Sequence, residues 1–194
     1  MAMLDVLTGI DESLFVFLHH LFRGPAVDSV MWWISNTYVW IPLYILLAWW
    51  VIRTFGWRRG LIFIIAIALA VAMADSVCAR LIRPAVERMR PANPANPLSA
   101  IVCVVNDYRG GPFGFPSCHA ANTVTLATFF FLLTRNVWMR TGLAVWVAVN
   151  CVSRIYLGVH YPGDILFGAV VGMLSAFLWY YIARFFKSRF DNKC

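Results

Sequence analysis

The sequence predicts an all-α membrane protein, a polytopic bundle of helices that crosses the bilayer several times. Of its 194 residues, 61% are hydrophobic and only 13% are charged, whereas soluble domains contain about 45–50% apolar and about 25% charged residues. This apolar excess is too large for one small core, so we expect much of it to face lipid. Nine Trp, seven Tyr and fifteen Phe agree, because aromatic side chains favour the membrane–water interface. No linker or repeat divides the chain, which predicts a single integral membrane domain over residues 1–194.

The first apolar segment is Ser13–Phe22. Only ten residues separate Glu12 from Arg23, and a membrane-spanning helix needs about 20. We therefore expect an N-terminal interfacial helix at this position, with a sixth span as the alternative.

Five further apolar segments are predicted to cross the membrane. The first is free of charge, the second is interrupted only by Asp75, and the third is short for a span. Gly168 and Gly172 in the fifth segment form a close-packing motif, which we expect to act within the bundle rather than between chains. In chain order the segments are Val30–Ile52, Leu61–Ala79, His119–Thr134, Val137–Ser153 and Ile165–Ala183.

The distribution of Arg and Lys predicts the orientation, because short cytoplasmic loops are enriched in both. With five spans, the loops after the first and third spans and the C-terminal tail lie on one side. We expect this side to be cytoplasmic and the protein to lie in the inner (cytoplasmic) membrane. It holds nine of the sixteen basic residues: Arg53, Arg58, Arg59, Arg135, Arg140, Arg184, Lys187, Arg189 and Lys193.

The opposite side, facing the periplasm or exterior, carries a loop that breaks this rule. A concentration of arginines on the outer side suggests that they are retained for a ligand. The net charge of +7 does not indicate nucleic-acid binding, because the basic residues form no strip interleaved with aromatics. The arginines of the outer loop are Arg80, Arg83, Arg88, Arg90 and Arg109.

Three polar clusters lie at the predicted outer ends of the spans. In the first, Arg83 and Arg90 are seven residues apart, so in a helix they would share a face. Two guanidinium groups on one face suit a phosphate, which accepts bidentate hydrogen bonds. The alternative is that both side chains snorkel to anionic lipid headgroups.

The second cluster is Pro116-Ser117-Cys118-His119, at the entry to the third span. Ser117 is a favoured N-cap, and the backbone N–H groups of the first helical turn lack partners. Those donors and the helix dipole form an anion site, with His119 beside it. An ordinary helix cap next to an interfacial histidine is the alternative.

The third cluster comprises Ser153, Arg154, His160 and Asp164. Pro162 fits the first turn of the fifth span, so His160 precedes the helix and Asp164 lies within its first turn. The carboxylate can then orient the imidazole, which is the arrangement that nucleophilic catalysis needs. A capping aspartate and an unrelated histidine would be the simpler explanation. Ionisable residues at membrane depth are costly and usually functional, and all three clusters lie on one predicted side.

The three motifs resemble the signature of the type 2 phosphatidic acid phosphatases, the PAP2 superfamily, which also includes vanadium haloperoxidases. The matching residues run from Arg83-x6-Arg90-Pro91 through Pro116–His119 to Ser153-Arg154-x5-His160-x3-Asp164. Two positions differ from the family pattern, which usually has Lys in place of Arg83 and Gly in place of Cys118.

The resemblance implies that His160 attacks phosphorus and forms a phosphohistidine, while Asp164 stabilises the imidazolium. His119 would protonate the leaving oxygen and then deprotonate water. No cluster of carboxylates suggests a metal site, so we expect a metal-independent mechanism without a cofactor. By the same resemblance, the phosphoryl oxygens would be held by Arg83, Arg90, Ser117, Cys118 and Arg154.

The expected function is hydrolysis of a phosphomonoester or diphosphate on a membrane lipid, at the periplasmic face. An outward-facing site favours lipid A or undecaprenyl diphosphate, with phosphatidylglycerol phosphate and phosphatidic acid as further candidates. The alternatives are a phosphotransferase that uses a sugar or lipid hydroxyl as acceptor, and a non-enzymatic anion transporter.

Overall fold

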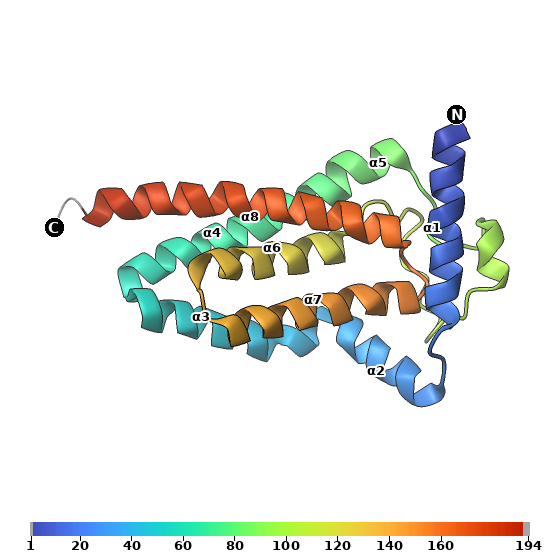
Figure 1. Ribbon diagram of the computed structural model, residues 1–194, viewed down its shortest axis with the longest axis horizontal. Helices are drawn as coiled ribbons and strands as arrows, with labels where there is room; N and C mark the ends of the chain where they lie inside the picture. Colours follow the sequence, from blue (N-terminus) through green and yellow to red (C-terminus); the bar gives the residue numbers. More distant parts are fainter. Residues whose placement is uncertain (1, 192–194) are drawn as a thin grey trace.

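The computed structural model describes residues 2–191, and this part of the chain folds into helices joined by short turns and one long loop (Figure 1). The described residues form no β-strand beyond one isolated bridge between Met89 and Phe113, so the predicted all-α fold is confirmed. Helical turns at Thr37–Trp40, Val77–Ile82 and Pro97–Ala100 extend or connect the main helices. These are α1 (Ala2–His20), α2 (Pro25–Ser35), α3 (Ile41–Phe55), α4 (Trp57–Ser76), α5 (Arg83–Val86), α6 (Cys118–Leu133), α7 (Val137–Tyr156) and α8 (Pro162–Asp191).

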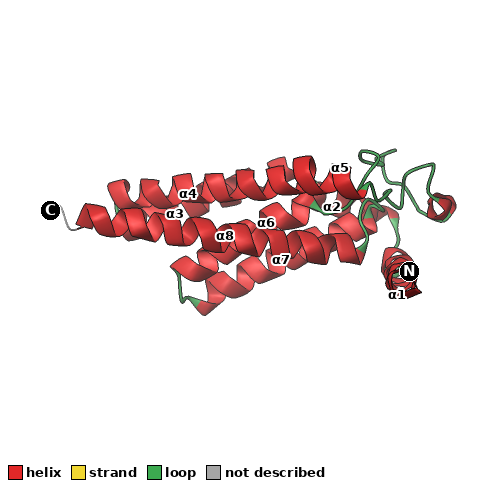
Figure 2. Ribbon diagram, turned by 90° about the horizontal axis from the view of Figure 1, so that it is seen from above, coloured by secondary structure: helices red, strands yellow, loops and turns green. Residues whose placement is uncertain are grey.

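The bundle consists of α3, α4, α6, α7 and α8, which run along one common direction (Figures 1 and 2). Helix α6 lies inside it, because it packs against α4, α7 and α8 and buries side chains such as Ala120 and Phe129. Large apolar side chains cover the outside instead, including Ile45 and Leu174, each 64% exposed. An apolar exterior around a packed interior suits a bundle surrounded by lipid.

Three helical stretches are long and apolar enough to cross a membrane. They are Thr37–Phe55, Trp57–Val86 and Pro162–Ser188. Helix α6 is apolar but has only 16 residues, and α7 lies beside it with 20 residues. The chain is therefore a multi-pass membrane protein, and the count of five spans stays a prediction. Lys193, one of the basic residues assigned to the cytoplasmic side, lies outside the described residues.

The first predicted span, Val30–Ile52, is not one helix. Helix α2 ends at Ser35, and the chain turns at Asn36, whose side chain accepts a hydrogen bond from the backbone N–H of Tyr38 at 3.0 Å. Asparagine competes with the helix by forming such local bonds, so it favours caps and turns. An uncharged run alone does not show this break. The turn sets α2 at an angle to α3 (Figure 1).

Helix α1 lies across one end of the bundle, and most of the loops gather at the same end (Figures 1 and 2). It is longer than the predicted interfacial segment Ser13–Phe22, since it starts at Ala2. Its inner face is anchored by buried Phe15, while Phe17 is 62% exposed. A helix across the bundle axis agrees with an interfacial position rather than a sixth parallel span.

The glycine motif of α8 joins it closely to α6. A Cβ atom on Gly168 would collide with the carbonyl oxygen of Ser117, and one on Gly172 would collide with that of Ala121. The motif therefore acts within the bundle, as the sequence predicted. Close contact here fixes the start of α8 against the start of α6, and both starts carry predicted site residues.

Candidate active site

Backbone hydrogen bonds join the three predicted clusters at the α1 end of the bundle. The N–H of Ser117, at the start of α6, donates to the carbonyl oxygen of Asp164 in α8 at 3.0 Å. The N–H of Ala92, which follows the Arg83–Arg90 segment, donates to the carbonyl oxygen of Gly158 at 2.9 Å. Residues that are distant in sequence thus form one site.

His160 is 2% exposed and contacts residues of two clusters. Arg90 Nη1 lies 3.1 Å from His160 Nε2, and Asp164 Oδ2 lies 3.5 Å from His160 Nδ1. Because a guanidinium can only donate, Nε2 must be the acceptor, and the ring proton then resides on Nδ1, which faces the carboxylate. This tautomer leaves the Nε2 lone pair directed at Arg90.

Burial and charge keep the His160 imidazole neutral. Burial lowers its pKa well below the usual value, and the positive charges of Arg90 and Arg154 lower it further, followed by those of Arg83 and His119. A histidine with a lowered pKa stays unprotonated at neutral pH, so its Nε2 lone pair remains available. The arginines of the first and third clusters thus act electrostatically on the same imidazole.

Three arginines converge on this site. Arg83 Nη2 donates to the Pro116 carbonyl oxygen at 3.0 Å and to Cys118 Sγ at 2.8 Å. Arg154, which is 7% exposed, donates to the Ser35 and Tyr108 hydroxyl groups. Among the described residues, the buried Nε atoms of Arg83, Arg90 and Arg154 have no hydrogen-bond partner.

This crowding of positive charge favours an anion. Burial lowers the pKa of Arg90 to about 10, and the nearby charges of Arg154 and Arg83 contribute. Buried charges and buried donors without partners are costly, so an anion that accepts from these guanidinium groups would relieve both costs. A phosphate has the charge and the oxygen atoms to do so.

The start of α6 has the predicted cap. Ser117 is fully buried with extended backbone angles, and its Oγ accepts a hydrogen bond from the Ala120 N–H at 3.3 Å. His119 Nε2 donates to Asn150 Oδ1 at 3.2 Å, which leaves Nδ1 as its second ring nitrogen. The Asn150 side-chain amide in turn donates to the Trp146 carbonyl oxygen at 2.8 Å.

The shared-face argument assumed that the whole Arg83–Arg90 segment is helical, but it is not. Helix α5 ends at Val86, and Glu87 has a left-handed backbone with φ 51°. The chain from Arg88 to Arg90 leaves the helix, and the side chains of Arg88 and Arg90 both reach the third cluster. Arg83 and Arg90 still meet at the site, but the end of the helix brings them there rather than two helical turns.

Sequence reasoning missed two groups, Arg88 and Asn150. Arg88 Nη1 donates to Asp164 Oδ1 at 2.9 Å and to Asp11 Oδ2 of α1 at 2.7 Å. The signal for Asn150 was available: it is a polar residue in an apolar segment, four positions before Arg154 and hence on the same helical face. Nothing in the sequence separates Arg88 from the other arginines of the loop.

The chain is similar in sequence to lipid phosphatases of other organisms. The chain is 38% identical over 190 residues to a lipid A 4'-phosphatase from Bacteroides thetaiotaomicron, covering 98% of this chain and 84% of the relative. It is 28% identical over 144 residues to an undecaprenyl-diphosphatase from Sulfolobus acidocaldarius, covering 74% of this chain and 63% of the relative.

A solved structure has a similar fold. The crystal structure of a transmembrane PAP2 type phosphatidylglycerolphosphate phosphatase from Bacillus subtilis superposes with a TM-score of 0.65 at 22% identity, covering 95% of this chain and 87% of that one. The model of the PAP2 superfamily matches residues 59–188, a range that includes all three clusters. The chain therefore belongs to the PAP2 superfamily and is a membrane phosphatase.

Proposed function

We propose that the chain removes a phosphate from lipid A through a phosphohistidine on His160, at the periplasmic face of the inner membrane. The observation that carries this proposal is the position of His160, with Nδ1 facing Asp164 and Nε2 facing Arg90. A phosphate bound by the Arg90 guanidinium would meet the Nε2 lone pair. A histidine nucleophile needs this pairing of an orienting carboxylate with an oxyanion-binding group.

The reaction proceeds in two balanced steps. His160 Nε2 attacks phosphorus, the bond from phosphorus to the lipid oxygen breaks, and His119 gives a proton to that oxygen. Water then attacks the phosphohistidine, His119 takes its proton, and the nitrogen–phosphorus bond breaks to release inorganic phosphate. Asp164 stabilises the positive imidazole ring in between.

The phosphoryl oxygens are held by three arginines and by the start of α6. In the transition state the negative charge lies on these oxygens, so fixed positive groups stabilise it. Arg83, Arg90 and Arg154 supply that charge from three different segments, and Ser117 and Cys118 contribute the helix start. We propose that the reaction needs no metal ion, because the guanidinium groups take the part that a cation would otherwise have.

An apolar cavity of about 460 Å³ supports a lipid substrate. It begins at His119 and continues between α3, α4, α6 and α7, which places it in the apolar part of the bundle. Hydrocarbon transferred into such a cavity remains in an apolar environment, so a chain of the lipid can enter while its phosphate stays at the histidines. The lining includes Tyr44, Val51, Ile67, Leu126, Phe130 and Trp146.

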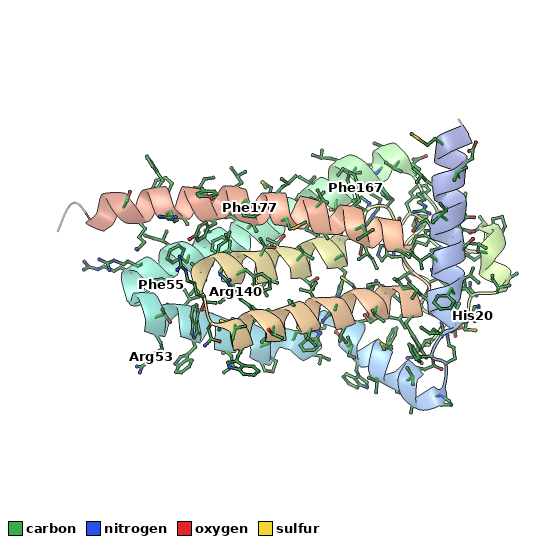
Figure 3. All side chains as sticks on the ribbon, viewed as in Figure 1. His20, Arg53, Phe55, Arg140, Phe167 and Phe177 are labelled. Atoms are coloured by element: carbon green, nitrogen blue, oxygen red, sulfur yellow. The ribbon has the colours of Figure 1, made fainter. Side chains whose placement is uncertain are left out.

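The basic residues support the proposed orientation. Arg53 and Arg140 lie at the end of the bundle opposite α1, whereas His20 marks the end near the site (Figure 3). Short loops rich in Arg and Lys face the cytoplasm. The site would then face the periplasm, where the phosphate of an outer-leaflet lipid is accessible.

Phosphate release from lipid A in the presence of EDTA tests the chemistry. Purified wild-type protein should release phosphate, and His160→Ala should lower the rate at least about 10³-fold, because it removes the nucleophile. His20→Ala is the matched control, since His20 is exposed at the end of α1, where its ring packs against His19. A rate that EDTA abolishes, or one that His160→Ala preserves, would refute the mechanism.

Undecaprenyl diphosphate, assayed in parallel, tests the choice of substrate. The similarity to a lipid A 4'-phosphatase extends over nearly the whole chain, whereas that to an undecaprenyl-diphosphatase covers 74% of it. We therefore expect a higher kcat/KM for lipid A. A preference for undecaprenyl diphosphate would keep the phosphatase mechanism and replace the substrate.

A further inference from the structure

A second cavity, of about 350 Å³, lies beside the site, and each of its lining residues carries a polar side-chain atom. This volume is at the lower end of the range for small-molecule sites, about 300–1,000 Å³. Only Thr37 lines both cavities. The lining residues are Trp32, Ser35, Asn36, Thr37, Tyr38, Tyr108 and Arg154.

Arg154 connects this cavity to the reacting group. Its charge is one of those that lower the pKa of His160, and its guanidinium donates to two groups of the cavity wall, the hydroxyls of Ser35 and Tyr108. A molecule in the cavity therefore lies next to Arg154, the guanidinium that holds a phosphoryl oxygen in the proposed function. A group bonded directly to the scissile phosphate can reach this place.

The wall combines aromatic rings with hydroxyl and amide groups. Trp32 and Tyr108 stand at 75° to each other with ring centres 5.4 Å apart, and Tyr38 is 78% exposed. Ser35, Asn36 and Thr37 add short polar side chains. Aromatic rings pack well against the C–H faces of a sugar, and the polar groups can bond its hydroxyls.

Every residue that lines the second cavity carries a polar side-chain atom, so the hydroxyl groups of a sugar find hydrogen-bonding partners there. Most residues that line the first cavity have purely apolar side chains, which suit a hydrocarbon chain. The two cavities can thus take different parts of one amphiphile. A prenyl diphosphate has no sugar or ring hydroxyl to place in the second cavity.

We propose that the second cavity, formed by Trp32, Tyr38, Tyr108 and the Ser35–Thr37 turn, binds the sugar ring that carries the scissile phosphate. It makes the enzyme selective for phosphorylated glycolipids over prenyl diphosphates. This inference rests on the proposed phosphatase function and adds the residues that recognise the sugar of the substrate. The break at Asn36, which interrupts the first predicted span, has a role here because it forms part of the wall.

Replacing Trp32 tests the proposal. In Trp32→Ala, kcat/KM for lipid A should fall about tenfold, the loss expected for one good ring contact, and mainly through KM. The value for undecaprenyl diphosphate should change less than twofold. Trp33→Ala is the matched control, because Trp33 is the next residue of α2, is 61% exposed and does not line the cavity.

A second variant, Tyr38→Ser, protects the test against misfolding, because its side chain is exposed and little packing is lost. It should shift the preference in the same direction as Trp32→Ala. Equal losses of kcat/KM for both lipids in the two variants, or no loss for lipid A, would overturn the proposed sugar site and leave the phosphatase mechanism in place. A wild-type enzyme that hydrolyses undecaprenyl diphosphate as well as lipid A would also overturn it.

The failure of the underlying function gives a different result. If the wild-type protein releases phosphate from neither lipid, or if release survives His160→Ala, both the phosphatase mechanism and the sugar site are wrong. Activity that depends on His160 but does not respond selectively to Trp32 and Tyr38 leaves the mechanism intact and excludes only the sugar site.

Discussion

Asp164 has more partners than a group that serves only to orient His160. Its Oδ1 accepts from Arg88 at 2.9 Å, and its Oδ2 accepts from the Tyr161 N–H at 2.9 Å, whereas His160 Nδ1 lies 3.5 Å away. Arg88 also stacks on the Tyr161 ring, 3.8 Å from its centre. The buried carboxylate is thus fixed first by Arg88 and the backbone, and this fixed position then orients the imidazole.

Removing the Arg88 charge should therefore slow the reaction through Asp164. We expect Arg88→Gln to lower kcat about 10- to 100-fold, the range seen when outer partners of a site residue are lost, with little change in KM. Arg109→Gln is the control, because Arg109 lies in the same loop and donates to the Ala92 carbonyl oxygen instead. The measurement is kcat for lipid A.

A double-mutant cycle separates this positioning role from a direct one. If Arg88 acts through Asp164, Arg88→Gln combined with Asp164→Asn should be no slower than Asp164→Asn alone. Additive losses would show that Arg88 contacts the substrate itself.

At the level of helices, the sequence correctly predicts the features that depend on residues close together along the chain. Ser117 caps α6, Pro162 opens α8, and the four-residue spacing from His160 to Asp164 places the carboxylate near the ring, all from short-range rules. The pairing of Gly168 and Gly172 with α6 also follows from a known packing motif.

The parts that the sequence does not reveal depend on tertiary contacts. The turn after Val86 moves Arg88 and Arg90 out of the helix that a pattern of arginines suggested. Likewise, Asn36 breaks an uncharged run, and Asn150 is identified as a partner of His119 only once α6 and α7 are side by side. Spacing rules describe neighbours along the chain, whereas these contacts join residues from different helices.

The tight contact between α6 and α8 can be tested with one methyl group. Gly172→Ala places a Cβ atom against the Ala121 carbonyl oxygen, so the helices must separate. We expect a destabilisation of about 1–3 kcal/mol, typical of overpacking, measured as a lower Tm in detergent. Because α6 and α8 carry His119 and Asp164, activity should fall as well.

Gly142→Ala is the matched control for that helix contact. Gly142 lies in α7, and an added Cβ would meet nothing within 4 Å. Its Tm should stay the same or rise, since alanine favours a helix over glycine. Equal changes in both variants would show that helix propensity, rather than the α6–α8 contact, sets the stability.

For the whole molecule, the site and the basic residues Arg53 and Arg140 lie at opposite ends of the bundle, so the orientation that we propose decides which membrane leaflet the enzyme reaches. Arg53 lies in the last turn of α3 and Arg140 at the start of α7 (Figure 3), whereas α1 and the long loop cover the site end. The loop at the site end includes Cys103, an exposed free cysteine. The protein thus has a native reporter for the side that we expect to face the periplasm.

Labelling of Cys103 in intact cells tests the orientation. A thiol reagent that does not cross the inner membrane should modify Cys103 without permeabilisation of that membrane, and Cys103→Ser should remove this signal. Trp138→Cys, introduced into Cys103→Ser, reports the opposite end, since Trp138 is 82% exposed at the start of α7. Its label should appear only after the inner membrane is opened. The reverse labelling pattern would place the site on the cytoplasmic side. The orientation predicted from the basic residues would then be wrong, and the enzyme would act on lipids of the inner leaflet.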